Sequence, residues 1–373
     1  MASFANIIKA KAAPIATPGL SHFDRILARQ LFPGAYTKTV SGALVHVTDA
    51  IAGPALGAVL SIQFTQSGSG DPSPDNIRPI TGWTGANVWR TGKNLFYREL
   101  SGRGIDSVGK IVSAPTYDLH AAFIKAGQEY QNSINGTAAS AVRAYYTSEP
   151  YVGSASYNGA RYTSGNKFTA PIDGYVAVRS DVNADKTQLE IGNTATAYEA
   201  YTGTTYAITW QDVAGTVYGG TLDLIAGTLT VTDTLTTIDE NSGALVASVG
   251  GVWFADGVSI IDKGAGLIAC DSFTLINAQA ATADFKNAAT VGQFAGCSNE
   301  QRKTRVFFRD ERFTTTAALT AYLTDNPVHI VQKLATPQTY TITGTTPELL
   351  AGINNVWADT GDIALTYTGT KKE

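Results

Sequence analysis

A proline-rich segment between two strand-like runs constrains this chain most. Residues 68–80 contain three prolines, two glycines and two aspartates. In the preceding run, residues 58–64, apolar residues alternate with small or polar ones, which predicts a β-strand. Each proline fixes its own φ and biases the residue before it toward extended geometry. We therefore expect residues 68–80 to form a stiff, non-helical connector.

One side chain in this connector has a specific expected role. Arg78 stands between Ile77 and Pro79, and its five N–H donors can tie the connector to nearby carbonyl oxygens. We interpret the connector as a structural corner, with a binding loop as the alternative.

The composition favours short strands joined by tight turns. Among 373 residues, 44% are hydrophobic, only 16% are charged, and there are 37 glycines and 13 prolines. A disordered chain requires low hydrophobicity and high charge, so this composition excludes disorder. The length is sufficient for two or three domains. The sequence thus predicts a mainly all-β fold of tandem antiparallel β-sandwich modules with an N-terminal arm and a short helix.

The N-terminal segment, residues 1–40, is predicted to be an extended arm followed by a short amphipathic helix. Ser21 is a suitable N-cap, and Pro33-Gly34 would end the helix. The apolar stripe of this helix consists of Phe23, Ile26, Leu27 and Leu31. Because an isolated short helix is marginal in water, the stripe must pack on its own domain or dock on a neighbouring protein.

Three further modules follow. Residues 41–96 read as a β-module that contains the connector, residues 97–202 as a β-sandwich and residues 203–373 as a C-terminal β-rich domain. In the last module, a hairpin turns at Ile225-Ala226-Gly227 and a helix covers 316–323. The Ala-, Asn- and Gly-rich stretch 278–300 is predicted to be a surface loop.

Charge and cysteine content exclude several classes of partner. The net charge is −4, and the basic cluster from Arg302 to Arg312 is interrupted by acids, so we expect no nucleic-acid binding. No apolar run reaches the length of a membrane span, and residues 1–13 do not resemble a signal peptide. Cys270 and Cys297 could form a bridge, although two cysteines are too few for a disulfide scaffold and two buried thiols are the favoured interpretation.

The sequence offers no motif for a metal, a cofactor or a catalytic nucleophile. The four histidines are far apart, and no HExxH, CxxC or GxSxG spacing exists. The GxGxxA pattern at 264–269 lacks a βαβ context and is interpreted as a glycine bend. A glycosidase needs only two carboxylates facing a groove, so the acids to examine are Glu129, Glu149, Asp173 and Asp181. With no β-helix repeat, we predict a non-enzymatic protein, with a hydrolase as the least favoured alternative.

The tyrosine-rich part of the predicted sandwich supports sugar binding. The apolar face of a sugar stacks on an exposed aromatic ring, and neighbouring amides bind its hydroxyls. The candidate glycan-binding residues are Tyr145, Tyr146, Tyr151, Tyr157, Asn158 and Tyr162. About half of such a set is expected to face the core instead. The five tryptophans are predicted to be core residues or anchors between subunits.

Four motifs resemble those of phage and prophage virion proteins from Gram-positive gut bacteria, in the tail-fibre or minor structural protein family. They are GSGDPSPDNIRPITGWTG with GKNLF (68–85 and 92–96), QLE with TATAYE (188–190 and 194–199), VYGGTLD (217–223) and NNVWADTGD (354–362). The motifs span most of the chain after residue 40. The resemblance implies that residues 97–202 form a jelly-roll similar to carbohydrate-binding modules.

The resemblance also implies a function. We expect a structural protein of a virion, assembled in the cytoplasm of the host bacterium, that serves as a tail-fibre, baseplate or receptor-binding component contacting host surface polysaccharide. Other virion proteins are the expected partners, and the N-terminal helix would be the docking element. The weak affinity of a single sugar-binding site is multiplied when several copies bind together. We therefore expect a homo-oligomer, with a trimer as the first choice. The alternative is a capsid decoration or head-fibre protein with a purely architectural role.

Overall fold

The computed structural model describes most of the chain after residue 35. The described residues are 36–50, 53–54, 57–139, 141–181, 186–242, 245–247, 251–255, 266–280, 289–297, 306–343, 347–349 and 352–369. The predicted N-terminal helix with Phe23, Ile26, Leu27 and Leu31 lies outside these residues. The same holds for the basic residues 302–305 and for the first two residues of the glycine bend.

The predicted mainly all-β fold class is confirmed, with several antiparallel sheets and two helices in the described residues. The chain divides into two compact units. The first comprises Met1–Ala58, Asn87–Tyr206 and Thr345–Glu373, and the second comprises Val59–Ala86 and Ala207–Gly344. The predicted division into consecutive modules 41–96 and 203–373 therefore needs correction. Strands from these two ranges pair with each other within each unit, so neither range closes a sheet alone.

In one part of the first unit, the first and the last strands of the described chain pair with each other. The strands of this part are β1 (Tyr36–Gly42), β2 (Leu44–Ala50), β3 (Gly53–Pro54), β7 (Gly85–Thr91), β16 (Gly203–Thr209), β26 (Glu348–Leu349), β27 (Gly352–Ala358) and β28 (Ile363–Gly369). One sheet has the order β16-β7-β27-β2, and β1 pairs with β28. Alternate residues such as Val45, Val88 and Val356 are at most 1% exposed, so one face of this sheet forms the core.

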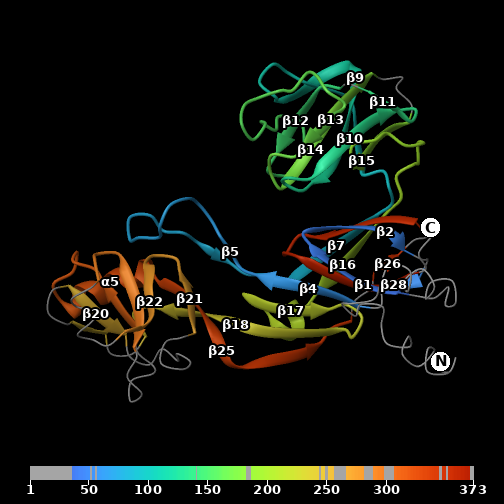
Figure 1. The fold of residues 1–373 in the computed structure, drawn as a ribbon. Helices are drawn as coiled ribbons and strands as arrows, with labels where there is room; N and C mark the ends of the chain where they lie inside the picture. The colour runs from blue at the N-terminus through green and yellow to red at the C-terminus, as the bar shows by residue number, and fades with distance from the viewer. Residues whose placement is uncertain are drawn as a thin grey trace, which may run out of the picture. The chain divides into compact units, whose positions relative to one another are not determined.

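The sandwich of the first unit consists of two four-stranded antiparallel sheets (Figure 1). One sheet has the order β12-β14-β9-β8. In the other, β10 pairs with β11 and β13 on one side and with β15 on the other. The strands are β8 (Arg98–Ile105), β9 (Ile111–Ile124), β10 (Glu129–Ile134), β11 (Thr137–Ala138), β12 (Arg143–Tyr146), β13 (Lys167–Thr169), β14 (Gly174–Asp181) and β15 (Thr187–Ile191).

Apolar side chains from both sheets fill the sandwich. Ala122, Val176 and Val178 from one sheet pack with Tyr130 and Leu189 from the other. The opposite face of β9, β12 and β14 is also buried, around Leu119 and Ala177, in a cluster that includes Tyr146, Ile105 at the end of β8 and Ile111 at the start of β9. Tyr146, a candidate glycan-binding residue, belongs to this second buried layer.

In the second unit, a long antiparallel sheet has the order β4-β17-β18-β25-β21. The elements here are β4 (Gly57–Gln63), β5 (Thr65–Gln66), β6 (Ile80–Thr81), α3 (Gln211–Ala214), β17 (Gly219–Asp223), β18 (Thr228–Ile238), β21 (Leu267–Cys270) and β25 (Val328–Thr341). The predicted hairpin between β17 and β18 is confirmed, with Gly227 at φ 64°. A bulge at Gly219/Gly220 accounts for the paired glycines of the VYGGTLD motif.

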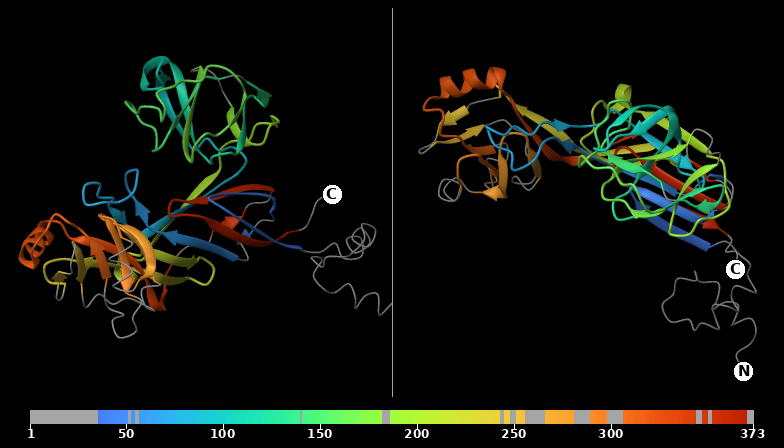
Figure 2. Two further views of the ribbon diagram at one scale, coloured as in Figure 1. Left: turned by 60° about the vertical axis from the view of Figure 1, so that its left-hand side comes forward. Right: turned by 90° about the horizontal axis from the view of Figure 1, so that it is seen from above.

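A five-stranded sheet and helix α5 complete the second unit (Figure 2). The elements are β19 (Leu245–Ala247), β20 (Val252–Ala255), β22 (Thr274–Ala280), β23 (Gln293–Cys297), β24 (Val306–Arg309) and α5 (Thr316–Asp325). The predicted helix is confirmed: Thr315 caps it, and Leu319 and Leu323 pack on Trp253. The predicted surface loop 278–300 is wrong in part, because β23 pairs with β22 and β24 and buries Phe294.

The proline-rich connector is a hydrogen-bonded corner, as predicted. The Arg78 guanidinium donates to the backbone oxygens of Ser67 and Gly70. The Asn76 side chain donates to the oxygens of Ser69 and Asp71 at 3.2 and 2.9 Å. These contacts are local, which is why the segment alone was sufficient to predict them.

Candidate functional site

A polar cleft lies where the apolar interior of the sandwich ends. Along β9 and β14, the inward-facing cross-strand pairs change from Ala122–Val176 to His120–Val178 and then to Asp118–Ser180. Side chains two residues apart on a strand share a face. The inner face of this sheet therefore turns from apolar to polar within two steps, so the end of the sandwich is not closed by hydrophobic packing.

The cleft has a volume of about 400 Å³, within the range of ligand sites in proteins. Its lining comes from β8, β9 and β14 of one sheet, from the start of β15 in the other, and from the segments that precede and follow the sandwich. The lining residues are Asn94, Phe96, Tyr97, Arg98, Glu99, Asp118, His120, Ser180, Lys186, Thr187, Tyr198 and Tyr201.

His120 stands at the junction between the core and the cleft. Its Nε2 lies 2.9 Å from the Ser180 hydroxyl oxygen, and its ring centroid lies 5.4 Å from that of Phe96. Burial lowers the pKa of His120 below its ordinary value, although the charges of Glu99 and Asp118 act in the opposite direction. The imidazole is therefore neutral at pH 7 and offers one donor and one acceptor.

Acidic and basic side chains line different walls of the cleft. Asp118 is 7% exposed, and one of its carboxylate oxygens accepts from the backbone N–H of Gly102 at 2.9 Å. Glu99 accepts from the Ser101 hydroxyl at 2.7 Å. Lys186, immediately before β15, is exposed and has a left-handed backbone with φ 63°. The cleft thus presents carboxylates on one sheet and an amine on the other.

Arg98 and Tyr97 belong to a neutralised cluster at the edge of the cleft. Arg98 forms an ion pair of 2.9 Å with Glu149, and the Tyr97 hydroxyl donates to the same carboxylate at 3.2 Å. Burial, followed by the charge of Glu149, raises the pKa of Tyr97. This phenol stays protonated and leaves its ring available as part of the cleft wall.

Asn94 of the GKNLF motif holds the two chain segments beside the cleft together. Its side-chain oxygen accepts from the backbone N–H groups of Phe96 and Leu189 at 3.1 and 3.3 Å. Its amide donates to the carbonyls of Thr187 and Glu199 at 3.4 and 3.2 Å. All four hydrogen-bonding positions of the buried amide are used, so Asn94 has a structural role.

The QLE and TATAYE motifs extend this buried network. Glu190 accepts from the backbone N–H and the hydroxyl of Thr196 at 2.9 and 2.7 Å. The Gln188 side-chain oxygen accepts from Glu199 N–H at 2.8 Å, and Lys93 pairs with the Glu199 carboxylate at 3.0 Å. These motifs fasten the segment that leaves the sandwich to the strand that precedes it.

The candidate glycan-binding tyrosines divide into buried and accessible residues. Tyr145 and Tyr146 are 3% and 1% exposed, on opposite faces of β12, so neither presents a ring to a ligand. The prediction for these two is wrong because Tyr145 faces the core between the two sheets, whereas Tyr146 packs with Ile111 and Leu119 on the other face. The Tyr146 hydroxyl donates to the carbonyl of Gly109 at 2.9 Å.

The other candidates lie in the loop between β12 and β13. Tyr151 and Tyr157 are 62% and 42% exposed. Tyr162 is half-buried, contacts Tyr145 edge-on and accepts from the Asn158 amide at 3.0 Å. Tyr151 and Tyr157 therefore remain accessible ring faces, whereas Tyr162 and Asn158 already pair with each other.

The acids selected from the sequence do not converge on one groove. Glu149 pairs with Arg98, and Asp173 accepts from the backbone N–H of Ala126 at 2.7 Å. Glu129 and Asp181 are exposed. Among the described residues, no group of three or more His, Cys, Asp or Glu is arranged to hold a metal ion.

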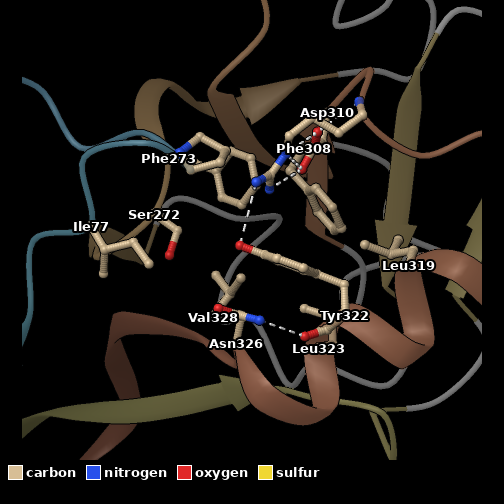
Figure 3. Close-up of a pocket in the computed structure, with 12 residues that line it drawn as sticks. Ile77, Ser272, Phe273, Phe308, Asp310, Leu319, Tyr322, Leu323, Asn326 and Val328 are labelled. Atoms are coloured by element: carbon tan, nitrogen blue, oxygen red, sulfur yellow. Dashed lines mark hydrogen bonds and ion pairs between the residues drawn. The ribbon is translucent and has the colours of Figure 1, made fainter.

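A second cavity lies in the second unit, between α5 and the end of β24 (Figure 3). Leu319, Leu323, Phe308 and Val328 line it, and its volume is about 10 Å³. Arg312 donates to Asp310 at 2.7 Å and to the Tyr322 hydroxyl at 3.4 Å. A space of this size holds at most one water molecule, so we assign it no ligand.

Sequence reasoning missed the cleft residues Asp118, His120 and Ser180. A usable signal was present, because polar residues occupy alternate positions that continue the apolar row of a strand. Recognising it requires the pairing of β9 with β14, which sequence spacing does not provide.

Comparison of the chain with protein-family models, with curated proteins and with solved structures finds no match. In the described part of the chain, neither helix is long and apolar enough to cross a membrane.

Proposed function

We propose that this chain is a structural protein of a phage virion, of the tail-fibre, baseplate or receptor-binding kind, and that its sandwich binds saccharides of the host surface. The motif resemblance to virion proteins supports the first part. The cleft of about 400 Å³ at the end of the sandwich carries the second.

The chemistry of the cleft suits a hydroxyl-rich ligand. Aromatic rings of Tyr97, Tyr198 and Tyr201 line it and offer surfaces for the apolar face of a sugar. Asp118 and Ser180 provide acceptors and a donor for hydroxyl groups. The exposed rings of Tyr151 and Tyr157 add a second contact surface elsewhere on the sandwich.

The binding role is tested with the full chain on an array of host-envelope polysaccharides. Asp118→Asn keeps an oxygen for the Gly102 N–H but removes the charge, and it should abolish or strongly weaken binding. Asp106→Asn is the matched control, because Asp106 likewise accepts backbone N–H bonds, from Val108 and Lys110, in a turn that does not line the cleft. Absence of binding by the unmodified chain, or equal binding by both variants, would refute the role.

The location in a virion is tested separately. Labelling of particles with an antibody to this chain should mark the tail or baseplate. Replacing Phe23, Ile26, Leu27 and Leu31 with serine should reduce incorporation if this stripe is the docking element. A trimer is expected in light-scattering measurements of the purified chain.

A purely architectural role on the capsid is the second proposal. The observation that favours it is that residues of all four motifs take part in structural contacts, namely Arg78, Glu190, the bulge at Gly219 and Asn355. If the antibody labels the capsid and the chain binds no polysaccharide on the array, this role is favoured over receptor binding.

A further inference from the structure

The charges around the cleft are separated between its walls, and this separation indicates the class of saccharide. Asp118 and Glu99 lie on β9 and β8 of one sheet, whereas Lys186 immediately precedes β15 of the other. Arg98 is already paired with Glu149 at 2.9 Å. Among the described residues that line the cleft, Lys186 is thus the cation without an ion-pair partner.

The backbone conformation of Lys186 is a second reason to assign this residue a functional role. Its φ of 63° lies in the left-handed region, which glycine adopts without strain and a lysine does not. Residues held in such conformations concentrate at functional sites. A long cationic side chain therefore occupies, at the mouth of the cleft, a position where glycine would fold more easily.

A second positive charge comes from Arg90, which does not itself line the cleft. Arg90 on β7 is 7% exposed, and its Nε and one terminal nitrogen have no hydrogen-bond partner. The other terminal nitrogen donates to the Thr204 hydroxyl at 2.8 Å. Its charge acts on the hydroxyl of Tyr201, which lines the cleft. A buried guanidinium without a carboxylate partner creates a positive potential that an anion would relieve.

We propose that the cleft binds a saccharide carrying one acidic group, a carboxylate or a phosphate, with that group at Lys186 and the sugar hydroxyls at Asp118 and Ser180. This inference rests on the proposed sugar binding. The carboxylates of Asp118 and Glu99 would repel an acidic group from the opposite wall, so the ligand has one preferred orientation.

The test compares matched neutral and acidic sugars. Binding to the full chain is measured by calorimetry or saturation-transfer NMR with glucose, glucuronic acid and glucose 1-phosphate, and with the corresponding galactose series. The acidic members should bind about twofold to fivefold more tightly than the neutral ones, because a partly exposed ion pair has that strength. The advantage should vanish in 1 M salt, where charges are screened over about 3 Å.

Two lysine variants test whether Lys186 causes the preference for acidic sugars. Lys186→Gly fits the left-handed backbone and should reduce the acidic preference while glucose binding stays unchanged. Lys167→Ala changes an exposed lysine on β13 that does not line the cleft, and should have no effect. A larger gain for glucuronic acid than for glucose 1-phosphate assigns the site to carboxylates, and the reverse assigns it to phosphates.

The outcomes separate this inference from the proposed function. If neutral and acidic sugars bind equally, or if Lys186→Gly retains the acidic preference undiminished, the acidic-saccharide inference is wrong and sugar binding stands. If no sugar of either series binds, both are wrong.

Discussion

The side-chain oxygen of Asn94 accepts a hydrogen bond of 3.3 Å from the backbone N–H of Leu189, a residue 95 positions further along the chain. This contact joins the segment before the sandwich to the last strand of the sandwich. The same amide also bonds the carbonyl of Glu199. One buried side chain thereby fixes both chain segments that border the polar cleft.

Replacing Asn94 with alanine should destabilise the sandwich by about 2–3 kcal/mol, because it leaves buried backbone groups without partners. Hydrogen exchange at β10 and β15 of the full chain measures the effect locally. Asn158→Ala is the control, since Asn158 is exposed and should change stability by no more than about 0.5 kcal/mol. Equal exchange rates in both variants would contradict the role of Asn94.

Arg78→Lys should make the connector more sensitive to proteases. A lysine ammonium cannot reproduce the planar fork that donates to the carbonyls of both Ser67 and Gly70. Limited proteolysis with mass spectrometry should show faster cleavage within residues 68–79. Asp75→Asn, at an exposed position of the same connector, should cleave at the unmodified rate. Unchanged cleavage of Arg78→Lys would contradict the role of the Arg78 guanidinium in holding the connector.

Gly219→Ala should destabilise the second unit by about 2 kcal/mol or more, because a Cβ there would overlap the Asp233 carboxylate across the bulge. The control is Gly127→Ala, where no atom lies within 4 Å and only the positive φ of 77° opposes the substitution, at about 1 kcal/mol. Thermal unfolding of the two variants gives the comparison. An effect at Gly219 no larger than at Gly127 would refute the steric explanation.

Acidification should weaken the sandwich through His120. Burial places the pKa of this histidine in the folded protein below the ordinary value of 6.5. As the pH falls below about 6.5, the unfolded chain binds a proton that the folded chain does not, so the free energy of unfolding decreases until the folded pKa is passed. His120→Gln keeps a group that can bond Ser180 and should show a smaller decrease between pH 7 and pH 5. Urea-unfolding midpoints measure this; identical pH dependence in the two proteins would rule out His120 as the cause.

Tyr146→Phe and Tyr151→Ala should separate structural from accessible tyrosines. The first removes the buried hydrogen bond to Gly109 and should cost about 1 kcal/mol of stability without changing sugar binding. The second truncates a ring that is 62% exposed and should leave stability within about 0.5 kcal/mol. Calorimetric unfolding measures the stability of both variants, and the polysaccharide array measures their binding. A large stability loss in Tyr151→Ala would show that this ring packs on the sandwich.

The features that were predicted correctly depend on neighbours along the chain. The turn at Gly227 needs a left-handed residue between two alternating runs, and the helix beginning at Thr316 needs a cap and an apolar stripe. Arg78 reaches carbonyls only 8 and 11 residues away. Composition and alternation were sufficient for the all-β class, because they describe the average environment of each residue and not its partners.

The sequence by itself determined the strands, the turns and the stiff connector, since these follow from local backbone preferences and side-chain periodicity. Only the tertiary structure decided which strands pair across the chain, which tyrosines lose their access to solvent and where the inner face of the sandwich becomes polar. Tyr146 is buried because it packs with Ile105, Ile111 and Leu119 from distant parts of the chain, and Asp118 lines the cleft together with its cross-strand partner Ser180. Such pairings join residues far apart in sequence, so no local pattern could specify them.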